Sequence, residues 1–319
     1  MRQQTQDLFA ANPTTCNQTY TDLLDFKRQD VRLHLNRVWQ WYLKVGLPDD
    51  NFLSDFPIQT SKRLWEMETA WFLHNCGFSL SNRKAGADFR CESEGKAFEV
   101  EAVAVGPGDE DNPDIVKEVP LVGEGPGRCS ETIYIPERER IELLRLTGAI
   151  NTKAKKRLCD INKAVSDSSL PFLIALSVVD MPKMLSDWDM PAALKAVYRI
   201  GCQCVDFDPA TRKPLRHRWQ CRPRIQKGTE SRENISTQMF CPGCGAPHHR
   251  EISALLYSDL DFRDAGYPYN PREYRKRFIL IHNADCTKRL ARGSLSVGAE
   301  YWLEESGPND YVLRDSKME

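Results

Sequence analysis

The sequence lacks the features that would place the chain in or across a membrane. None of its apolar runs approaches the ~18 residues that a helical span requires. Residues 1–7 are mostly polar and lack the apolar region of a signal peptide. We therefore expect a soluble, globular, cytoplasmic protein without a membrane partner. Internal repeats are absent as well, so the chain is not interpreted as a repeat protein.

The sequence also lacks the net charge that would attract nucleic acid over a distance. Its 44 Lys and Arg residues against 45 Asp and Glu leave a formal net charge of −1, so nucleic-acid binding must depend on local patches. One patch lies between residues 211 and 229, where no acid occurs. Alternation there predicts a strand or hairpin whose basic face could follow phosphates. That face would include Arg216, Arg218, Arg222 and Arg224. A solvated strand face paired with acids elsewhere explains the pattern equally well.

Cysteine, in contrast, is abundant, with 11 residues. In a chain without a secretion signal, scattered cysteines indicate reduced thiols or metal ligands rather than disulfides. The sequence Cys241-Pro-Gly-Cys244 resembles a zinc knuckle, and a structural zinc ion would need two further ligands. The candidates for these ligands are Cys202, Cys204, Cys221, His248 and His249. The alternative is a Pro-Gly turn with incidental thiols.

The length of 319 residues and a hydrophobic content of 41% allow a full core. We predict an α+β protein in three segments. Residues 1–50 form an N-terminal helical segment, residues 51–200 the core, and residues 201–319 a strand-rich region. Residues 106–130 are rich in Gly, Pro and acids, and predict a long loop carrying Asp109, Glu110 and Asp111. Residues 171–179 are apolar apart from Ser177, which is typical of a buried central strand.

A helix carrying Glu66 is predicted just after residue 60. Apolar residues recur from Ser61 at helical spacing, Thr60 or Ser61 can cap the start, and Gly77 can close the end. Glu66 then lies on one flank of this helix.

Three further acids follow on predicted strands. Alternation from residue 98 to residue 103 places Glu99 and Glu101 on one face. A polar, Gly-containing connection over residues 91–96 predicts an antiparallel hairpin that carries Asp88 beside the two glutamates. Clustered carboxylates repel one another unless a cation or protons intervene, and oxygen ligands suit Mg or Mn.

These elements resemble the core of the PD-(D/E)xK nuclease superfamily, over about residues 60–180. The resemblance implies a restriction-endonuclease-like mixed sheet flanked by helices. It also implies that Glu66, Asp88 and the strand acid hold Mg or Mn, while a lysine helps to activate water for attack on a phosphodiester. The expected activity is that of a metal-dependent endonuclease, with DNA rather than RNA as the partner. Paired cleavage would imply a homodimer.

The sequence departs from the family pattern because no lysine follows the strand acid. If Glu99-x-Glu101 is the pair, glutamate replaces the lysine, as in some restriction enzymes. If Glu101-x-Val103 is the pair, the lysine comes from the predicted helix at residues 137–165. Lys153 is the first candidate for this lysine and Lys156 the second. Glu101 is a ligand in either register.

Two other functions are compatible with the same residues. The fold could serve as a non-catalytic module that binds nucleic acid or protein and holds a structural zinc. A different metal-dependent hydrolase could use the same acids. His282 and Asn283, at a predicted strand end, are better explained by a hydrogen-bonded turn than by a catalytic pair.

Overall fold

The computed structural model describes most of the chain. The described residues are 6–10, 13–82, 85–108, 136–181, 190–208, 211–227, 233–242, 249–262, 270–307 and 310–317. Within these ranges the structure describes only the backbone of residues 26, 136–138, 202–207, 215–218, 307, 310 and 317.

The chain divides into two compact units, and each is discontinuous in sequence. The first, here called the sheet unit, contains residues 1–105, 153–180 and 250–319. The second, the hairpin unit, contains residues 106–152 and 181–249. These units differ from the three consecutive segments predicted from the sequence, because composition does not reveal that the chain leaves and rejoins one sheet.

The sheet unit is built on an eight-stranded mixed sheet, ordered β1-β2-β3-β4-β9-β10-β11-β12. The strands are β1 (Ser79–Ser81), β2 (Phe89–Ser93), β3 (Lys96–Ala104), β4 (Phe172–Ser177), β9 (Ala254–Ser258), β10 (Phe278–His282), β11 (Ala299–Gly307) and β12 (Asp310–Lys317). Parallel pairing joins β3 to β4, β4 to β9 and β10 to β11. The predicted α+β class with a mixed sheet is confirmed. Four strands of the predicted strand-rich region, β9 to β12, belong to the same sheet as the core strands.

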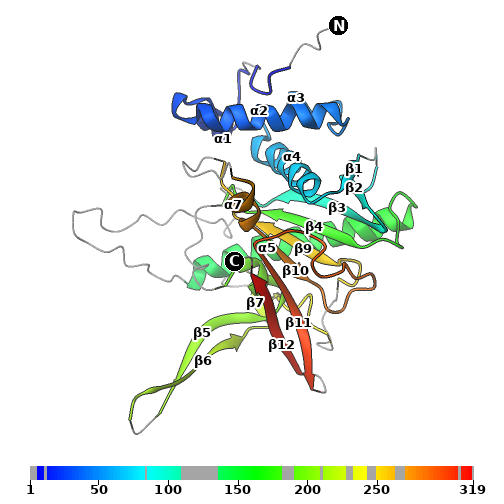
Figure 1. The fold of residues 1–319 in the computed structure, drawn as a ribbon. Helices are drawn as coiled ribbons and strands as arrows, with labels where there is room; N and C mark the ends of the chain where they lie inside the picture. The colour runs from blue at the N-terminus through cyan, green and yellow to red at the C-terminus, as the bar shows by residue number, and fades with distance from the viewer. Residues whose placement is uncertain are drawn as a thin grey trace, which may run out of the picture. The chain divides into compact units, whose positions relative to one another are not determined.

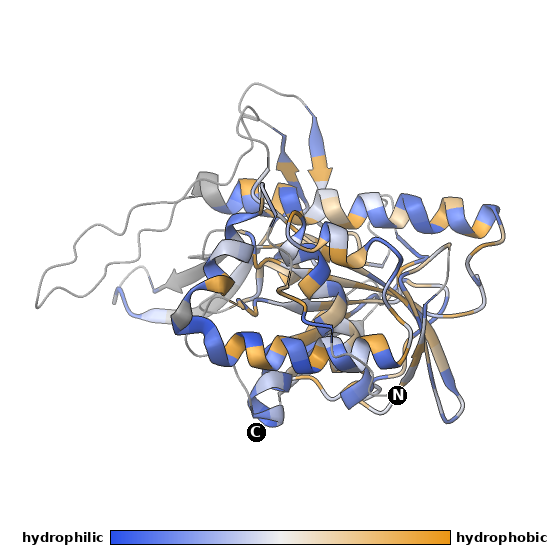
Figure 2. Cartoon of the chain, turned by 90° about the horizontal axis from the view of Figure 1, so that it is seen from above, coloured by the Kyte–Doolittle hydropathy of each residue, from blue (hydrophilic) through white to orange (hydrophobic). Residues whose placement is uncertain are grey.

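Helices cover one face of this sheet and form the main hydrophobic core with it. They are α1 (Gln18–Leu24), the 3-10 helix η1 (Phe26–Arg28), α2 (Gln29–Lys44), α3 (Phe52–Asp55), α4 (Thr60–Asn75) and α7 (Pro271–Lys276). Figure 1 shows α1, α2 and α3 beside α4, and α4 beside the sheet. The indole of Trp65 donates a hydrogen bond to the Ala175 carbonyl at 2.8 Å, and Phe72 stacks on Phe278. In Figure 2, hydrophobic and hydrophilic residues alternate along the long helices, as expected for helices with one buried face.

Helix α4 ends as predicted but begins differently. Gly77 follows it with a φ of +91°, a conformation that glycine adopts readily at a helix end. At the start, Gln59 is the N-cap residue and makes no side-chain cap. Thr60 lies inside the helix and donates its hydroxyl to the Phe56 carbonyl at 2.9 Å. The predicted Ser/Thr cap is wrong because the chain is already winding helically before residue 60, where Phe56 has an αR conformation.

The hairpin of β2 and β3 forms as predicted, with a shorter connection. Phe89 pairs with Val100 and Ser93 with Lys96, so only Glu94 and Gly95 lie in the turn. Gly95 has a φ of +69°, which a tight two-residue turn commonly requires. The strands therefore extend into the predicted polar connection. Strand β1 was not predicted, because three residues are too few to establish an alternating pattern.

The hairpin unit contains two antiparallel strand pairs and helix α6 (Ala192–Val197). Strand β5 (Ile200–Phe207) pairs with β6 (Pro214–Cys221), and β7 (Arg224–Gln226) pairs with β8 (Asn234–Ser236). The predicted strand or hairpin in the basic segment is thereby confirmed. Helix α5 (Pro136–Asn162) contributes residues to both units. No helix among the described residues combines the length and apolarity of a membrane span.

Candidate active site

A charged cavity of about 770 Å³ lies in the sheet unit beside the β2–β3 hairpin. Its charged lining residues are Asp49, Asp50, Lys62, Arg63, Glu66, Asp88, Glu101, Lys153 and Lys156. Three of the four predicted acids and both candidate lysines therefore line one cavity. They come from α4, from the residue before β2, from β3 and from α5.

Glu101 is the most completely paired acid of this cavity. Lys153 Nζ lies 2.7 Å from Oε1, and Lys156 Nζ lies 2.7 Å from Oε2. The two lysines are three residues apart on α5, a spacing that places side chains on one helix face. Lys156 also donates to the Gly86 carbonyl at 2.7 Å. Burial alone would lower the pKa of Lys156, but the nearby carboxylates, led by Glu101, raise it above its ordinary value.

Asp88 immediately precedes β2 and is fixed by the backbone of β3. Its Oδ2 accepts the amide N–H of Ala102 at 2.8 Å. Burial, followed by the charges of Glu101 and Glu66, raises the pKa of Asp88 to about 7. Desolvation and neighbouring like charges both disfavour an ionised carboxylate. Glu101 and Glu66 are thus close enough to influence the protonation of Asp88.

Glu66 is held in place from two sides. Tyr42 donates its hydroxyl to Oε1 at 2.9 Å, and Arg63 donates to Oε2 at 3.1 Å. Arg63 is only 7% exposed and also pairs with Asp49 and Asp55 at 2.9 and 2.6 Å. Burial raises the pKa of Glu66 despite the opposing effect of Arg63.

Tyr42 and Arg63, which hold the Glu66 carboxylate, were not among the residues predicted for the site. Arg63 lies three residues before Glu66 on α4, a spacing that could have suggested an ion pair on the helix surface. Tyr42 lies on a different helix, α2, and no local pattern links it to Glu66.

Glu99 has a different environment, although it lies two residues from Glu101 on the same strand. It is fully buried, forms an ion pair with Arg157, and accepts the N–H of Asp167 at 3.5 Å. The guanidinium of Arg157 also lies over the Phe172 ring at 4.6 Å. Glu99 does not line the cavity.

The chemistry of the cavity suits a hard divalent cation. Its acids offer only oxygen ligands, the donor type that Mg and Mn prefer. Burial is the main cause of the raised pKa of Asp88, and the charges of Glu101 and Glu66 add to it. A bound cation would relieve the repulsion among these carboxylates. A carboxylate has about four acceptor sites, and the two lysines take one on each oxygen of Glu101. Even so, within the described ranges no three His, Cys, Asp or Glu residues are already arranged as metal ligands.

The residues predicted to bind zinc are only partly described. Cys241 is buried, with Sγ 3.8 Å from the Val197 carbonyl, and Cys221 is exposed. Cys244 and His248 lie outside the described residues, as does the acidic loop from residue 109 onward. The side chains of Cys202 and Cys204 are likewise not described. A zinc site stays a prediction.

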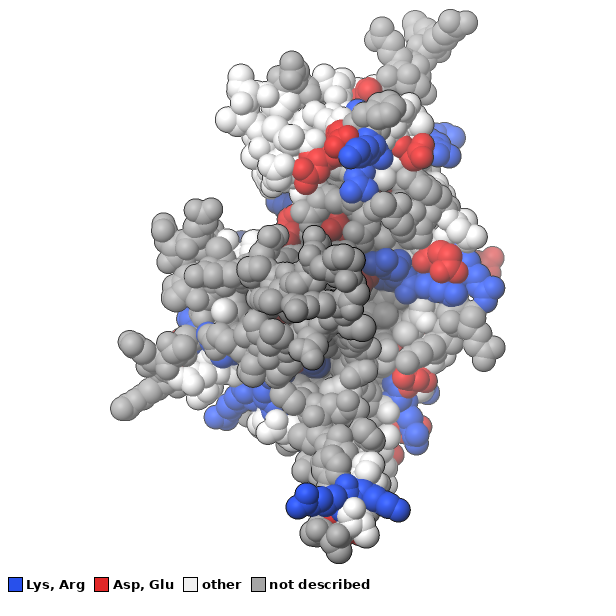
Figure 3. Space-filling model, turned by 90° about the vertical axis from the view of Figure 1, so that its left-hand side faces the viewer, with Lys and Arg blue, Asp and Glu red and all other residues white. Residues whose placement is uncertain are grey.

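The described arginines of the predicted basic face, Arg222 and Arg224, lie in different environments. Arg222 donates to buried Glu139 at 2.8 Å, and Lys195 donates to the same carboxylate at 2.7 Å. Arg224 is exposed, whereas the side chains of Arg216 and Arg218 are not described. Arg222 therefore has a structural role within the hairpin unit. On the face shown in Figure 3, acidic and basic side chains are interspersed.

The pair His282 and Asn283 has the structural role that the sequence favoured. Asn283 Oδ1 accepts the N–H of Asp285 at 3.0 Å, which forms a side-chain-stabilised turn. Its amide donates to the Ile252 carbonyl at 2.8 Å. His282 Nε2 lies 2.6 Å from a carboxylate oxygen of Glu300.

Comparison of the chain with protein-family models, curated proteins and solved structures finds no match. The class of site is therefore defined by its own chemistry: the carboxylates of Glu66, Asp88 and Glu101 and two lysines line one cavity beside the β2–β3 hairpin of a mixed sheet.

Proposed function

We propose that this protein is a metal-dependent nuclease with a restriction-endonuclease-like core, which hydrolyses phosphodiester bonds using Mg or Mn. DNA is the preferred substrate over RNA, and cleavage of both strands would involve a homodimer. One observation carries the proposal: Glu66, Asp88, Glu101, Lys153 and Lys156 line the same cavity.

The arrangement of these residues supports the proposal. The lysine that is missing after the strand acid has a spatial substitute, because Lys153 and Lys156 both reach Glu101 from α5. Glu99 is committed to Arg157 and lies outside the cavity lining. This favours Glu101, with a lysine from the helix, as the equivalent of the family's strand pair.

Each residue has a chemical role in this proposal. Glu66, Asp88 and Glu101 would hold the metal ion, which when bound lowers the pKa of a water molecule and offsets charge on the phosphate. Arg63 and Tyr42 keep the Glu66 carboxylate oriented. Lys153, whose side chain is 20% exposed, is placed to donate a hydrogen bond to the attacking water or to a phosphate oxygen. Fixed charges of this kind stabilise developing charge without reorganisation.

The decisive test is cleavage of DNA and RNA by wild type and by Asp88→Ala, with Mg or Mn present. We expect metal-dependent cleavage by wild type and a loss of about 100-fold or more in Asp88→Ala, because a ligand and its charge are removed. Glu94→Ala removes an exposed acid from the turn of the same hairpin and should retain activity. Robust cleavage by Asp88→Ala, or none by wild type on any DNA or RNA, would contradict the proposal.

The pairing of Glu101 with two lysines favours a second function. Both of its oxygens already pair with lysines, as expected if the fold is a non-catalytic module that binds nucleic acid or protein. In that case a structural zinc at Cys241 and Cys244 would be the relevant metal. Metal analysis separates the two functions. Tight zinc without binding of Mg or Mn favours the module, and Mn binding that Asp88→Ala abolishes favours the nuclease.

A further inference from the structure

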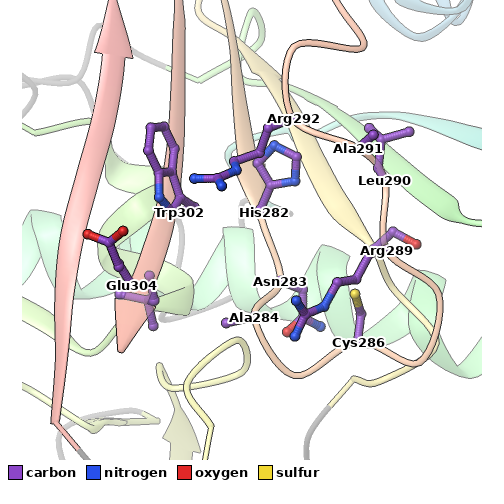
Figure 4. Close-up of a pocket in the computed structure, with 12 residues that line it drawn as sticks. His282, Asn283, Ala284, Cys286, Arg289, Leu290, Ala291, Arg292, Trp302 and Glu304 are labelled. Atoms are coloured by element: carbon purple, nitrogen blue, oxygen red, sulfur yellow. The ribbon is translucent and has the colours of Figure 1, made fainter. Parts of the chain in front are cut away.

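A second cavity of about 320 Å³ lies in the sheet unit, under the segment that connects β10 to β11 (Figure 4). Its lining includes Arg289, Arg292, Trp302 and apolar residues such as Leu290 and Leu303. The volume is at the lower end of the range of small-molecule pockets, about 300–1,000 Å³. A ligand of nucleotide size or smaller would fit.

This cavity is separate from the acidic one. Along one line of paired residues across the sheet, Glu101 is opposite Ile174, Ile174 opposite Leu255, Leu255 opposite Ile281, and Ile281 opposite Tyr301. Neighbouring strands lie about 4.8 Å apart, so the four steps from Glu101 to Tyr301 span about 19 Å. Trp302, which lines the second cavity, is the next residue after Tyr301.

Two guanidinium groups reach this cavity with their donors uncommitted. Within the described part of the chain, Arg289 and Arg292 form no ion pair and donate no hydrogen bond. Arg292 lies over the Trp302 ring, 4.8 Å from its centroid, and this contact orients the guanidinium plane. Figure 4 shows it beside the indole, with Arg289 near Cys286. The acid in the lining, Glu304, is paired with Arg314 at 2.6 Å.

A third donor belongs to Trp302. Its Nε1 atom is buried, and it has no hydrogen-bond partner in the described structure. Buried donors are rarely left without a partner, and each instance calls for an explanation such as a bound ligand or water. An acceptor group in the cavity would satisfy this N–H.

The segment that carries the two arginines is anchored to the sheet. Glu300 Oε1 pairs with His282 at 2.6 Å, and both Glu300 oxygens accept the N–H of Gly293 at 3.1 Å. Burial would raise the pKa of Glu300, but these donors lower it below its ordinary value. Glu300 thus fixes the backbone next to Arg292. The Arg289 and Arg292 side chains themselves are exposed, so a ligand can reach both.

We propose that this cavity binds a phosphate group carried by a ligand of nucleotide size or smaller. Arg289 and Arg292 would contact the phosphate oxygens and the Trp302 indole would donate to the same ligand. Planar guanidinium forks match the oxygen geometry of phosphate. The phosphate could belong to a free nucleotide or to the end of a nucleic-acid strand. The proposal does not rest on nuclease activity.

The test is isothermal titration calorimetry on the full chain with EDTA present, so that no metal-dependent cleavage can occur. The probes are inorganic phosphate, adenosine monophosphate, a single-stranded oligonucleotide with a 5′-phosphate, the same oligonucleotide without it, and succinate. We expect binding of at least one phosphate probe, and weaker binding of succinate. Preference for the phosphorylated oligonucleotide over its unphosphorylated form and over adenosine monophosphate assigns the phosphate to a strand end. Equal or tighter binding of adenosine monophosphate or inorganic phosphate assigns it to a free molecule.

Matched variants locate the binding. Arg289→Gln and Arg292→Gln should each weaken it about tenfold or more, the usual scale for losing a hydrogen bond between charged groups. Trp302→Phe keeps an aromatic ring and removes the N–H, and should weaken binding several-fold. If Arg292→Gln fails to fold, Arg292→Lys replaces it. This variant keeps the positive charge but lacks the planar guanidinium, so it tests whether the guanidinium geometry is needed for binding. Arg37→Gln removes an exposed arginine from α2 and should bind normally. Absence of binding by every phosphate probe, equal affinity for succinate, or unchanged affinity in both arginine variants would overturn the proposal.

Discussion

Glu101 and Glu99 lie two residues apart on the same face of β3, yet their environments are opposite. Glu101 lines a cavity and is paired with two lysines whose side chains are 20% and 41% exposed. Glu99 is paired with one arginine whose side chain is 2% exposed, and its own side chain is 1% exposed. Strand alternation puts both acids on one face, but the helix opposite them decides their environment.

The difference shows how the same residue type can be structural at one position and available for chemistry at the next. Arg157 presents a planar fork that binds Glu99, donates to the Asp167 carbonyl at 2.7 Å and lies over Phe172. Because the side chain of Arg157 is buried, a ligand cannot reach it. The lysines of Glu101 are flexible point charges that reach solvent, so their positions can change when a ligand enters. Breaking the Glu99 pair should therefore change stability, and altering the Glu101 group should change pH response and catalysis.

The largest expected effect is on stability, in Arg157→Leu. This change leaves Glu99 buried without its counter-charge, and removal of one partner of a buried ion pair typically destabilises a protein by about 3–5 kcal/mol. Urea unfolding monitored by circular dichroism gives the change. Lys156→Met, which removes one partner of Glu101, should alter the unfolding free energy far less because Lys153 remains.

A double variant isolates the buried pair. Replacing both partners, with Glu99→Met and Arg157→Met, leaves no uncompensated charge and should recover most of the loss, as observed for other buried ion pairs. If Arg157→Leu and Lys156→Met destabilise the protein equally, the two environments do not differ as described.

The next largest effect concerns Asp88 and pH, in metal-free buffer. Its pKa is raised to about 7 in the folded protein, mainly by burial and then by Glu101 and Glu66, against about 3.9 in an unfolded chain. A raised acid pKa contributes stability that is full below about pH 4 and is lost as pH rises through about 7. Asp88→Asn mimics the protonated form at every pH. Its stability relative to wild type should therefore increase from about pH 4 to about pH 7, by part of the ~4 kcal/mol that the full shift represents.

Unfolding free energies at pH 5, 6, 7 and 8 measure this difference. Adding Mg at pH 8 should stabilise wild type and not Asp88→Asn, because the cation would replace the proton as the source of charge relief. A pH-independent difference between the two proteins would show that Asp88 has an ordinary pKa.

Much of the candidate site could be predicted because its signals are local. The spacing of apolar residues located the helix of Glu66, and alternation located the hairpin that carries Asp88 and Glu101. Lys153 and Lys156 followed from the resemblance to the nuclease superfamily, which allows the lysine to come from a later helix, together with their position on a predicted helix. Local patterns sufficed here because each acid lies on a regular element, or in the case of Asp88 directly before one, whose direction is set by its period.

The remaining features depend on contacts between residues far apart in sequence. Glu99 and Arg157 are separated by 58 positions, and Arg63 with Asp49 by 14, so no periodicity relates them. The second cavity likewise requires the pairing of β10 with β11 to bring Arg292 onto Trp302. Local patterns therefore located the acids but could not distinguish Glu101, which lines a cavity, from Glu99, which is buried in an ion pair.

The smallest effect separates the two lysines that share Glu101. Lys153→Met should reduce single-turnover cleavage about 10- to 100-fold, the usual scale for loss of one positioned catalytic group. Lys156→Met should have a smaller effect, because Lys156 also donates to the Gly86 carbonyl and its side chain is more exposed, 41% against 20%. Lys153→Arg, which restores the charge, should recover part of the rate. If the lysines only compete with the metal for Glu101, both Met variants should bind Mn more tightly and keep the wild-type rate at saturating Mn. A larger loss in Lys156→Met would instead exchange the roles of the two lysines.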